Sequence, residues 1–95
     1  MEKKKRSRLE VVFDILSIVR NNGHRIRITP LIRHSGLSPQ SFSSYFAKLR
    51  DRGFLEEKFD DGEGRVIILT EKGSSYIREY RAVLRFVKEF ELEEL

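Results

Sequence analysis

The sequence predicts a mostly helical α+β fold in which two helices joined by a tight turn precede a β-hairpin and a long last helix. Two pairs, Thr29-Pro30 and Ser38-Pro39, mark helix starts nine residues apart. Residues 60–64, DDGEG, join two strand-like runs as a hairpin turn. From residue 76 onward, apolar residues recur at spacings of 4, 3, 4 and 3, which is typical of a heptad seam. This order of elements is that of a winged helix-turn-helix with a two- to three-stranded antiparallel wing and a C-terminal coiled-coil helix.

The first helix is expected to begin after Ser7, because Ser7 and Glu10 form the pattern of a capping box. Residues 21–23, NNG, end it, with a glycine free to take a positive φ. Residues 24–28 alternate cationic and aliphatic side chains, which predicts a short strand with one wet face. Apolar residues at helical spacing predict the buried stripe of the first helix, formed by Leu9, Val12, Phe13, Leu16 and Val19.

The second helix is expected over residues 30–35, with Thr29 as its N-cap and Pro30 at its first position, and Gly36 permits a sharp turn after it. The third is expected from about residue 39 to 52, with its inner face formed by Phe42, Phe46 and Leu49.

Strands over residues 54–59 and 65–69 flank the hairpin turn, in which Gly62 and Gly64 are both available for positive φ. Thr70 caps the last helix, which we expect to reach about residue 92. We therefore divide the chain into a basic arm over residues 1–6, a winged-helix domain over 7–70 and a dimerisation helix over 71–95.

Composition and charge narrow the class of protein. The chain of 95 residues has no cysteine, which excludes a disulfide framework and a Cys-ligated zinc. No apolar run approaches the ~20 residues of a membrane span and no signal peptide is recognisable, so we expect a cytoplasmic protein. Residues 1–54 hold 12 Lys and Arg against 4 Asp and Glu, whereas residues 55–95 hold 7 against 11. This asymmetry favours a polyanionic partner, and a heavily solvated surface of thermophile type is the alternative.

The outer face of the third helix is the first candidate for contact with nucleic acid. Glutamine pairs with adenine, serine reaches base edges or phosphate, and lysine binds phosphate or guanine. The alternative is an ordinary solvated face, but such a face usually carries glutamate, and residues 29–50 contain no Asp or Glu. Proline at the helix start keeps rigid an end whose free backbone donors suit a phosphate. The expected contacts are Pro39, Gln40, Ser41, Ser44, Tyr45 and Lys48.

Two further basic segments are candidates. In the wing, Lys58 and Arg65 flank the turn, and we expect Arg65 to touch DNA, while the acidic tip at residues 60–63 repels phosphate. That tip lacks the length and ligand spacing of a calcium site. At the amino end, a basic arm either binds a duplex through counterion release or only keeps the chain soluble. Its cations include Lys4, Lys5 and Arg6.

The last helix is expected to join two copies of the chain. Its first part, Tyr76, Ile77 and Tyr80, is expected to pack on the domain's own core. The apolar residues beyond it are too far from so small a core to be buried by it. Leaving each of them exposed to solvent would lose ~1.5–3 kcal/mol of burial free energy. A second copy is therefore expected to cover a seam formed by Tyr80, Val83, Leu84, Val87 and Phe90.

The sequence contains no pattern typical of an enzyme. His24 and His34 are the only histidines, and no Gly-x-Ser-x-Gly elbow or Gly-rich phosphate loop occurs. We expect no catalytic residue, no metal, no cofactor and no small-molecule substrate.

Three segments carry a family resemblance: RSRLEVVFDILSIV, GLSPQSFSSYFAKLRDRGFLE and ILTEKGSSYIREY. They resemble the archaeal winged-helix proteins typified by the small, ten-kilodalton crenarchaeal chromatin proteins, most specifically through residues 37–53 and the Leu-Thr-x-Lys-Gly run at 69–73. The resemblance implies an antiparallel coiled-coil homodimer that binds double-stranded DNA with weak sequence preference, nucleoid-associated or regulatory. A sequence-specific transcriptional regulator and a winged-helix protein–protein interaction module are the alternatives.

Overall fold

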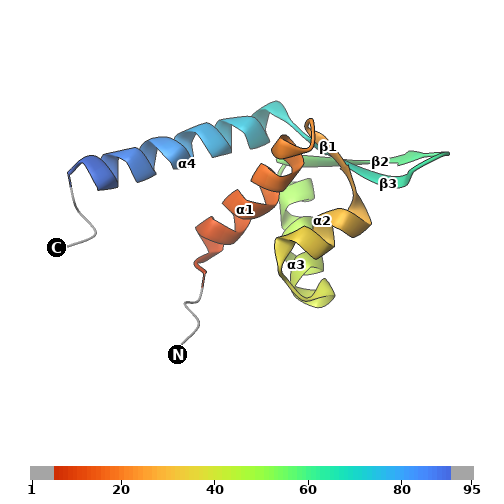
Figure 1. Ribbon diagram of the computed structural model, residues 1–95. Helices are drawn as coiled ribbons and strands as arrows, with labels where there is room; N and C mark the ends of the chain where they lie inside the picture. Colours follow the sequence, from red (N-terminus) through yellow and green to blue (C-terminus); the bar gives the residue numbers. More distant parts are fainter. Residues whose placement is uncertain (1–5, 91–95) are drawn as a thin grey trace.

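The computed structural model describes residues 6–90. Its elements follow in the order α1 (Arg8–Asn21), β1 (Arg25–Arg27), α2 (Ile28–Ser35), α3 (Pro39–Asp51), β2 (Leu55–Asp60), β3 (Gly64–Leu69) and α4 (Glu71–Glu89) (Figure 1). The three strands form one antiparallel sheet in the order β1-β3-β2. The predicted winged helix-turn-helix with a long last helix is thereby confirmed.

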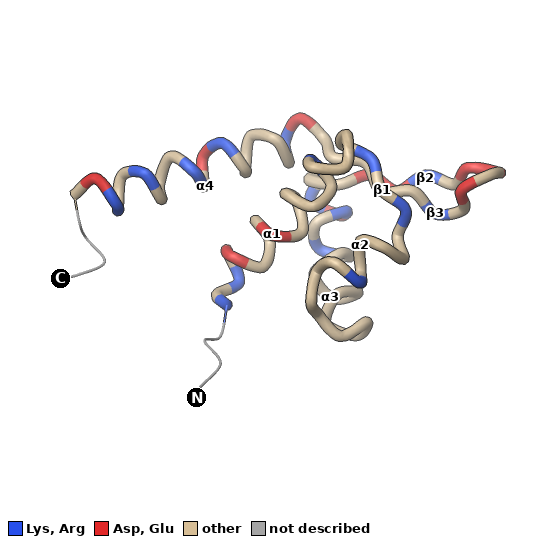
Figure 2. Tube along the Cα trace, viewed as in Figure 1, with Lys and Arg blue, Asp and Glu red and all other residues tan. Residues whose placement is uncertain are grey.

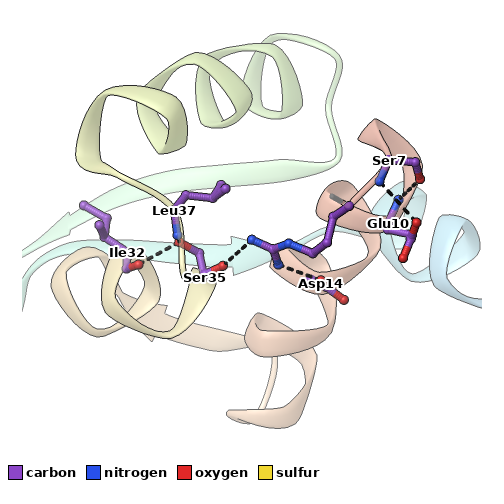
Figure 3. Close-up of polar contacts among 7 residues, drawn as sticks. Ser7, Glu10, Asp14, Ile32, Ser35 and Leu37 are labelled. Carbon is purple, nitrogen blue, oxygen red and sulfur yellow. Dashed lines mark hydrogen bonds and ion pairs between the residues drawn. The ribbon is translucent and has the colours of Figure 1, made fainter. Parts of the chain in front are cut away.

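The start of α1 is as predicted, but its buried face is not. The Ser7 hydroxyl accepts a hydrogen bond from the Glu10 N–H, and the Glu10 carboxylate accepts one from the Ser7 N–H, both at 3.1 Å (Figure 3). Leu9, predicted to be buried, is 62% exposed. The buried residues of this helix are Val11, Ile15, Leu16 and Val19. Helical spacing fits either face, and the partners that α1 meets in the fold select the one that is buried.

The prediction for the start of α2 was wrong by two residues. The helix begins at Ile28, and its N-cap is Arg27, which makes no side-chain capping bond. Pro30 is therefore the third helical residue rather than the first. Its missing N–H costs nothing there either, because the first four N–H groups of a helix have no partner within it. Since Ile28 joins the helix, the preceding strand shortens to residues 25–27, with only Ile26 buried.

The turn between α2 and α3 is built as predicted. Gly36 takes a left-handed conformation with φ of 72° and ends α2. The buried Ser35 hydroxyl donates to the Ile32 carbonyl at 2.6 Å and accepts from the Leu37 N–H at 3.2 Å (Figure 3). The Ser38 hydroxyl then caps α3 by accepting from the Ser41 N–H at 3.1 Å. The inner face of α3 is confirmed as Phe42, Phe46 and Leu49, each at most 4% exposed.

Both strands of the hairpin begin one residue away from their predicted positions, and of the two glycines in its turn only Gly64 has a positive φ, 76°. The last helix ends at Glu89 with Phe90 as its C-cap, short of the predicted residue 92. Acidic side chains crowd this end of the sequence, where the helix dipole disfavours negative charge. In the described part of the chain, no helix is both long enough and apolar enough to cross a membrane.

The Leu-Thr-x-Lys-Gly run at residues 69–73 fastens α4 to the junction of α3 and β2. The Thr70 hydroxyl lies 2.6 Å from the Gly53 carbonyl oxygen and 3.0 Å from that of Phe54, and accepts from the Gly73 N–H at 3.1 Å. The Lys72 ammonium donates to the Arg52 carbonyl at 2.7 Å and lies over the Phe54 ring. The run therefore sets the direction in which α4 leaves the domain.

The two halves of α4 differ in their surroundings. Ile77 is buried, Tyr80 stacks on Phe13 of α1 with ring centroids 4.5 Å apart, and Tyr76 donates to the Leu9 carbonyl at 2.9 Å. The prediction that this first half packs on the domain's own core is confirmed. The second half projects away from the rest of the molecule, on the side opposite to the β2-β3 hairpin (Figure 1).

Candidate nucleic-acid interface

The outward face of α3 presents small polar side chains and one lysine. All but one of the six residues predicted for it are exposed. The exception is Tyr45, which is half-buried and packs against the hydrophobic core. The exposed residues are Pro39, Gln40, Ser41, Ser44 and Lys48.

Arg50 also lies on this helix and was missed by the sequence analysis. Its guanidinium is 5.7 Å from the centre of the Phe46 ring and 3.6 Å from the Glu57 carboxylate of β2. Arg65 of β3 approaches the same ring at 5.9 Å and pairs with the same carboxylate. The two arginines thus connect α3 to the wing. Helical periodicity is compatible with Arg50 at the edge of the outward face, but only the fold shows that this edge is beside the hairpin.

A cleft of about 470 Å³ separates the start of α2 from the wing. Three of its lining residues are cations, Arg27, Arg33 and Arg65, and one is an acid, Glu63. The first turn of α2 lines the cleft, and its backbone N–H groups receive no side-chain capping bond from Arg27. Convergent guanidinium groups next to backbone donors suit a phosphate group. Of this set, only Arg65 was predicted from the sequence as a contact.

The acidic wing tip is partly neutralised by a residue outside the hairpin. Arg25 of β1 pairs with Glu63 at 2.9 Å and with Asp60 at 3.5 Å. The Asp60 carboxylate also accepts hydrogen bonds from the N–H groups of Gly62 and Glu63. These backbone bonds, with the nearby Arg25, hold the pKa of Asp60 below its ordinary value. The predicted repulsion of phosphate at the tip is therefore smaller than the acids alone imply.

Of the basic arm, only Arg6 falls within the described residues, and Lys4 and Lys5 lie outside them. The Arg6 guanidinium pairs with Asp14 at 2.8 Å and donates to the Ser35 carbonyl at 3.0 Å. This residue therefore ties the start of α1 to the end of α2, rather than extending as part of an arm.

The segment that contains β1, α2 and most of α3 carries only positive charge, and two of its arginines, Arg25 and Arg50, pair with carboxylates of the wing. Residues 15–50 contain no Asp or Glu, although the chain as a whole is 36% charged. Figure 2 shows Lys and Arg without any acid on β1 and α2, whereas the acids gather at the wing tip and along α1 and α4. Within residues 6–90, no three His, Asp or Glu side chains are placed to hold a metal ion. The chemistry that this surface offers is the binding of anions.

A short helix, a tight glycine turn and a second helix with an exposed outer face, flanked by a β-hairpin, define a winged helix-turn-helix protein. The family model described as winged helix-turn-helix matches residues 5–88, and the chain belongs to that family.

Solved structures that share the fold include the following two. One is Sso10a-2, a DNA-binding protein from Sulfolobus solfataricus, with a TM-score of 0.74 and 24% identity over 94% of this chain and 90% of that one. The other is F93 from STIV, a winged-helix DNA-binding protein, with a TM-score of 0.72 and 24% identity over 85% of this chain and 92% of that one. The resemblance to small archaeal winged-helix proteins is thereby confirmed. Among curated protein sequences, none matches this chain.

Proposed function

We propose that this protein binds double-stranded DNA as a homodimer, with low sequence specificity and an architectural, nucleoid-associated role in the cytoplasm. The main observation behind the proposal is that residues 15–50 contain no Asp or Glu, a segment that includes the whole helix-turn-helix except its last residue, Asp51. The DNA binding of Sso10a-2 and of F93, named for both proteins, supports it.

The exposed side chains of α3 favour DNA binding with low sequence specificity. In the proposed complex α3 enters the major groove, where exposed serines and Lys48 meet phosphates or base edges without a fixed pairing. The cleft formed by Arg27, Arg33 and Arg65 would hold a backbone phosphate beside the wing. Contacts of this kind fix the position of a protein on a duplex but carry no sequence information.

The second half of α4 supports the homodimer. Four large apolar side chains on it are between 49% and 60% exposed, among them Phe86, whose ring lies 4.9 Å from that of Phe90. Tyr80 extends this surface toward the domain, although its ring also stacks on those of Phe13 and Tyr76. We propose that residues 71–95 serve as the dimerisation element, with an interface formed by Tyr80, Val83, Leu84, Phe86, Val87 and Phe90.

One observation favours a sequence-specific regulator as the second candidate. Gln40 is exposed in the first turn of α3, where a side chain reaches base edges most easily, and glutamine pairs bidentately with adenine.

Fluorescence anisotropy with two duplexes of unrelated sequence, across a series of salt concentrations, tests the proposal. Each copy offers four cations to the DNA, Lys48, Arg27, Arg33 and Arg65, so a dimer offers eight. We therefore expect the logarithm of the association constant to fall with the logarithm of the salt concentration with a slope of about −7. Affinities within about tenfold of one another support low specificity, whereas a ratio of ~10³ or more for one selected site would establish the regulator instead. No binding to either duplex at low salt would overturn both and favour a protein–protein interaction module.

A further inference from the structure

A second cavity, of about 500 Å³, lies between the start of α1, the second half of α3 and the start of α4. It is separate from the cleft beside the wing and shares no lining residue with it. Its walls are largely apolar and aromatic, and include Leu9, Val12, Tyr45, Phe54 and Tyr76. A volume of this size is within the range of small-molecule sites, which are concave, mostly apolar and provided with a few polar groups.

The aromatic wall is held in place before any ligand binds. The rings of Tyr76 and Phe54 meet edge to face with centroids 5.8 Å apart. The Tyr76 hydroxyl donates to the Leu9 carbonyl across the cavity wall. The Lys72 ammonium also lies over the Phe54 ring, 4.7 Å from its centre. A site whose side chains are already fixed binds a ligand without the entropic cost of ordering those side chains.

Beside the hydroxyls of Ser44, Tyr45 and Tyr76, the polar groups at the cavity are cationic. Arg8, Lys48 and Arg52 line it, and no Asp or Glu does. None of these three side chains forms an ion pair with any of the described residues. Arg25, Arg50 and Arg65, in contrast, are all paired with carboxylates. An apolar cavity edged by unpaired cations complements a molecule with an apolar body and a negative head.

We propose that this cavity binds an amphipathic organic anion, with an aromatic or branched body against Tyr45 and Tyr76 and a carboxylate or sulfonate between Lys48 and Arg52. The anion would also oppose DNA binding, a step that rests on the proposed function, because Lys48 belongs to both surfaces. One ammonium cannot neutralise a ligand and a phosphate at once. By linkage, DNA lowers the affinity for the anion by the same factor as the anion lowers the affinity for DNA.

Binding is tested without DNA, with two dyes that share a fused-ring body. The probes are 8-anilinonaphthalene-1-sulfonate, an anion, and N-phenyl-1-naphthylamine, its neutral analogue. We expect the anionic dye to bind with a Kd on the order of 10–100 µM, as its size allows. The neutral dye is expected to bind at least tenfold more weakly. Equal affinity for the two dyes would show an apolar pocket without anion selectivity and would overturn the proposal.

Exposed positions at the cavity provide variants that keep the fold. Arg52→Gln is expected to weaken the anionic dye about tenfold. Leu9→Asp, which adds a carboxylate at the rim, is expected to weaken it more than its uncharged counterpart Leu9→Asn does. Arg20→Gln, at the other end of α1, is the matched control for a lost positive charge and is expected to leave binding unchanged.

The exposed apolar surface of α4 is the competing location for a dye. Phe86→Ser is expected to leave the anionic dye bound, because the cavity does not include that surface. If dye binding disappears in Phe86→Ser but survives in Arg52→Gln and in Leu9→Asp, the dye occupies α4 and the proposal is wrong.

The link to DNA is then measured by titrating the anionic dye into the protein–duplex complex. We expect the apparent affinity for DNA to fall about tenfold at saturating dye in the parent protein, and Arg52→Gln to need about tenfold more dye for the same fall. If dye and DNA bind at the same time without affecting each other's affinity, the proposed competition between the anion and DNA is wrong. Absence of DNA binding before any dye is added would instead contradict the proposed function, so the two failures are distinguishable.

Discussion

Arg25 forms ion pairs with two of the three carboxylates at the wing tip. Exposed pairs of this kind contribute little to stability. Their effect on charge is larger, because Asp60, Asp61 and Glu63 together carry −3, and Arg25 reduces the sum to −2. The wing can therefore approach a duplex with less repulsion than its own sequence suggests.

Replacing Arg25 with glutamine is expected to weaken DNA binding several-fold at 50 mM salt, because the tip regains its full negative charge. The loss should shrink by 300 mM salt, since charges more than a Debye length apart are then screened. Anisotropy at the two salt concentrations measures this, with Arg20→Gln as the control that removes the same charge elsewhere. Equal losses for the two variants would mean that the wing tip does not approach the DNA.

Lys48→Ala is expected to lower the affinity for every duplex alike and to reduce the salt slope by about one unit per copy, because one phosphate contact is lost. Lys88→Ala, at the far end of α4, removes the same charge and is expected to leave the slope unchanged. Salt titrations of the two variants side by side measure the difference. An unchanged slope for Lys48→Ala would exclude this lysine from the interface.

Ser17 carries the one buried side-chain polar atom without a hydrogen-bond partner among the described residues. Burying an unpaired hydroxyl is costly, and alanine is also the better helix former. We expect Ser17→Ala to raise the free energy of unfolding by about 1 kcal/mol. Urea denaturation measures it, with the exposed Ser43→Ala reporting helix propensity alone. A stability gain no larger than that of Ser43→Ala would mean that the Ser17 hydroxyl is satisfied in solution.

At the scale of elements, the junction between α4 and the domain depends on a glycine. A Cβ added at Gly73 would lie 2.4 Å from the Phe54 carbonyl oxygen and 2.5 Å from Leu69 Cδ1. Only a residue without a side chain lets α4 start so close to Phe54 and Leu69. This explains physically why glycine ends the Leu-Thr-x-Lys-Gly run, whose threonine and lysine bond to neighbouring carbonyls.

Gly73→Ala is expected to destabilise the fold by about 1–3 kcal/mol, as overpacking does, although alanine is the better helix former. The control is Gly62→Ala in the wing turn, where the nearest atom would be 3.5 Å from the new Cβ. Thermal unfolding of the two variants tests this. If Gly73→Ala unfolds at the temperature of the parent protein, α4 must shift readily on the domain.

The elements that could be predicted from the sequence are those fixed by local chemistry. Ser7, Ser38 and Thr70 all cap helices as expected, because a capping bond spans three residues. The prediction that Thr29 is the N-cap of α2 was wrong, because a proline fits either the first or the third helical position. The exposure of Leu9 could not be foreseen, since the buried face of a helix depends on the partners that it meets in the fold.

The candidate site shows the same division. The exposed serines, Gln40 and Lys48 follow from helical periodicity once the buried face of α3 is recognised. Arg25 pairs with Asp60, 35 positions further along the chain, and with Glu63, 38 positions further. The cleft lined by Arg27, Arg33 and Arg65 likewise brings α2 next to β3. Contacts between such distant positions need the register of β1 on β3, in which Arg25 lies opposite Ile68. No pattern in the sequence specifies that register.

At the scale of the whole molecule, the chain is elongated. Its extents are 52 × 33 × 21 Å, and its radius of gyration of 14.6 Å exceeds the roughly 12 Å of a compact domain of this length. The 19 residues of α4 account for about 28 Å of that length. A helix that leaves its domain with Val83, Phe86 and Phe90 exposed is stabilised only if something covers it.

Val87→Glu is expected to convert the dimer to monomers, because a carboxylate at the centre of the proposed interface would be buried without a partner. Arg85→Glu is the matched control: it introduces the same side chain two residues away, on the opposite side of α4 from Val87, and is expected to remain dimeric. Sedimentation velocity distinguishes the two states. The monomer should also bind DNA with about half the salt slope, since it presents one copy of α3 instead of two. A Val87→Glu protein that sediments as a dimer would place the contact between copies elsewhere, and dissociation of both variants would point to net charge rather than the apolar interface.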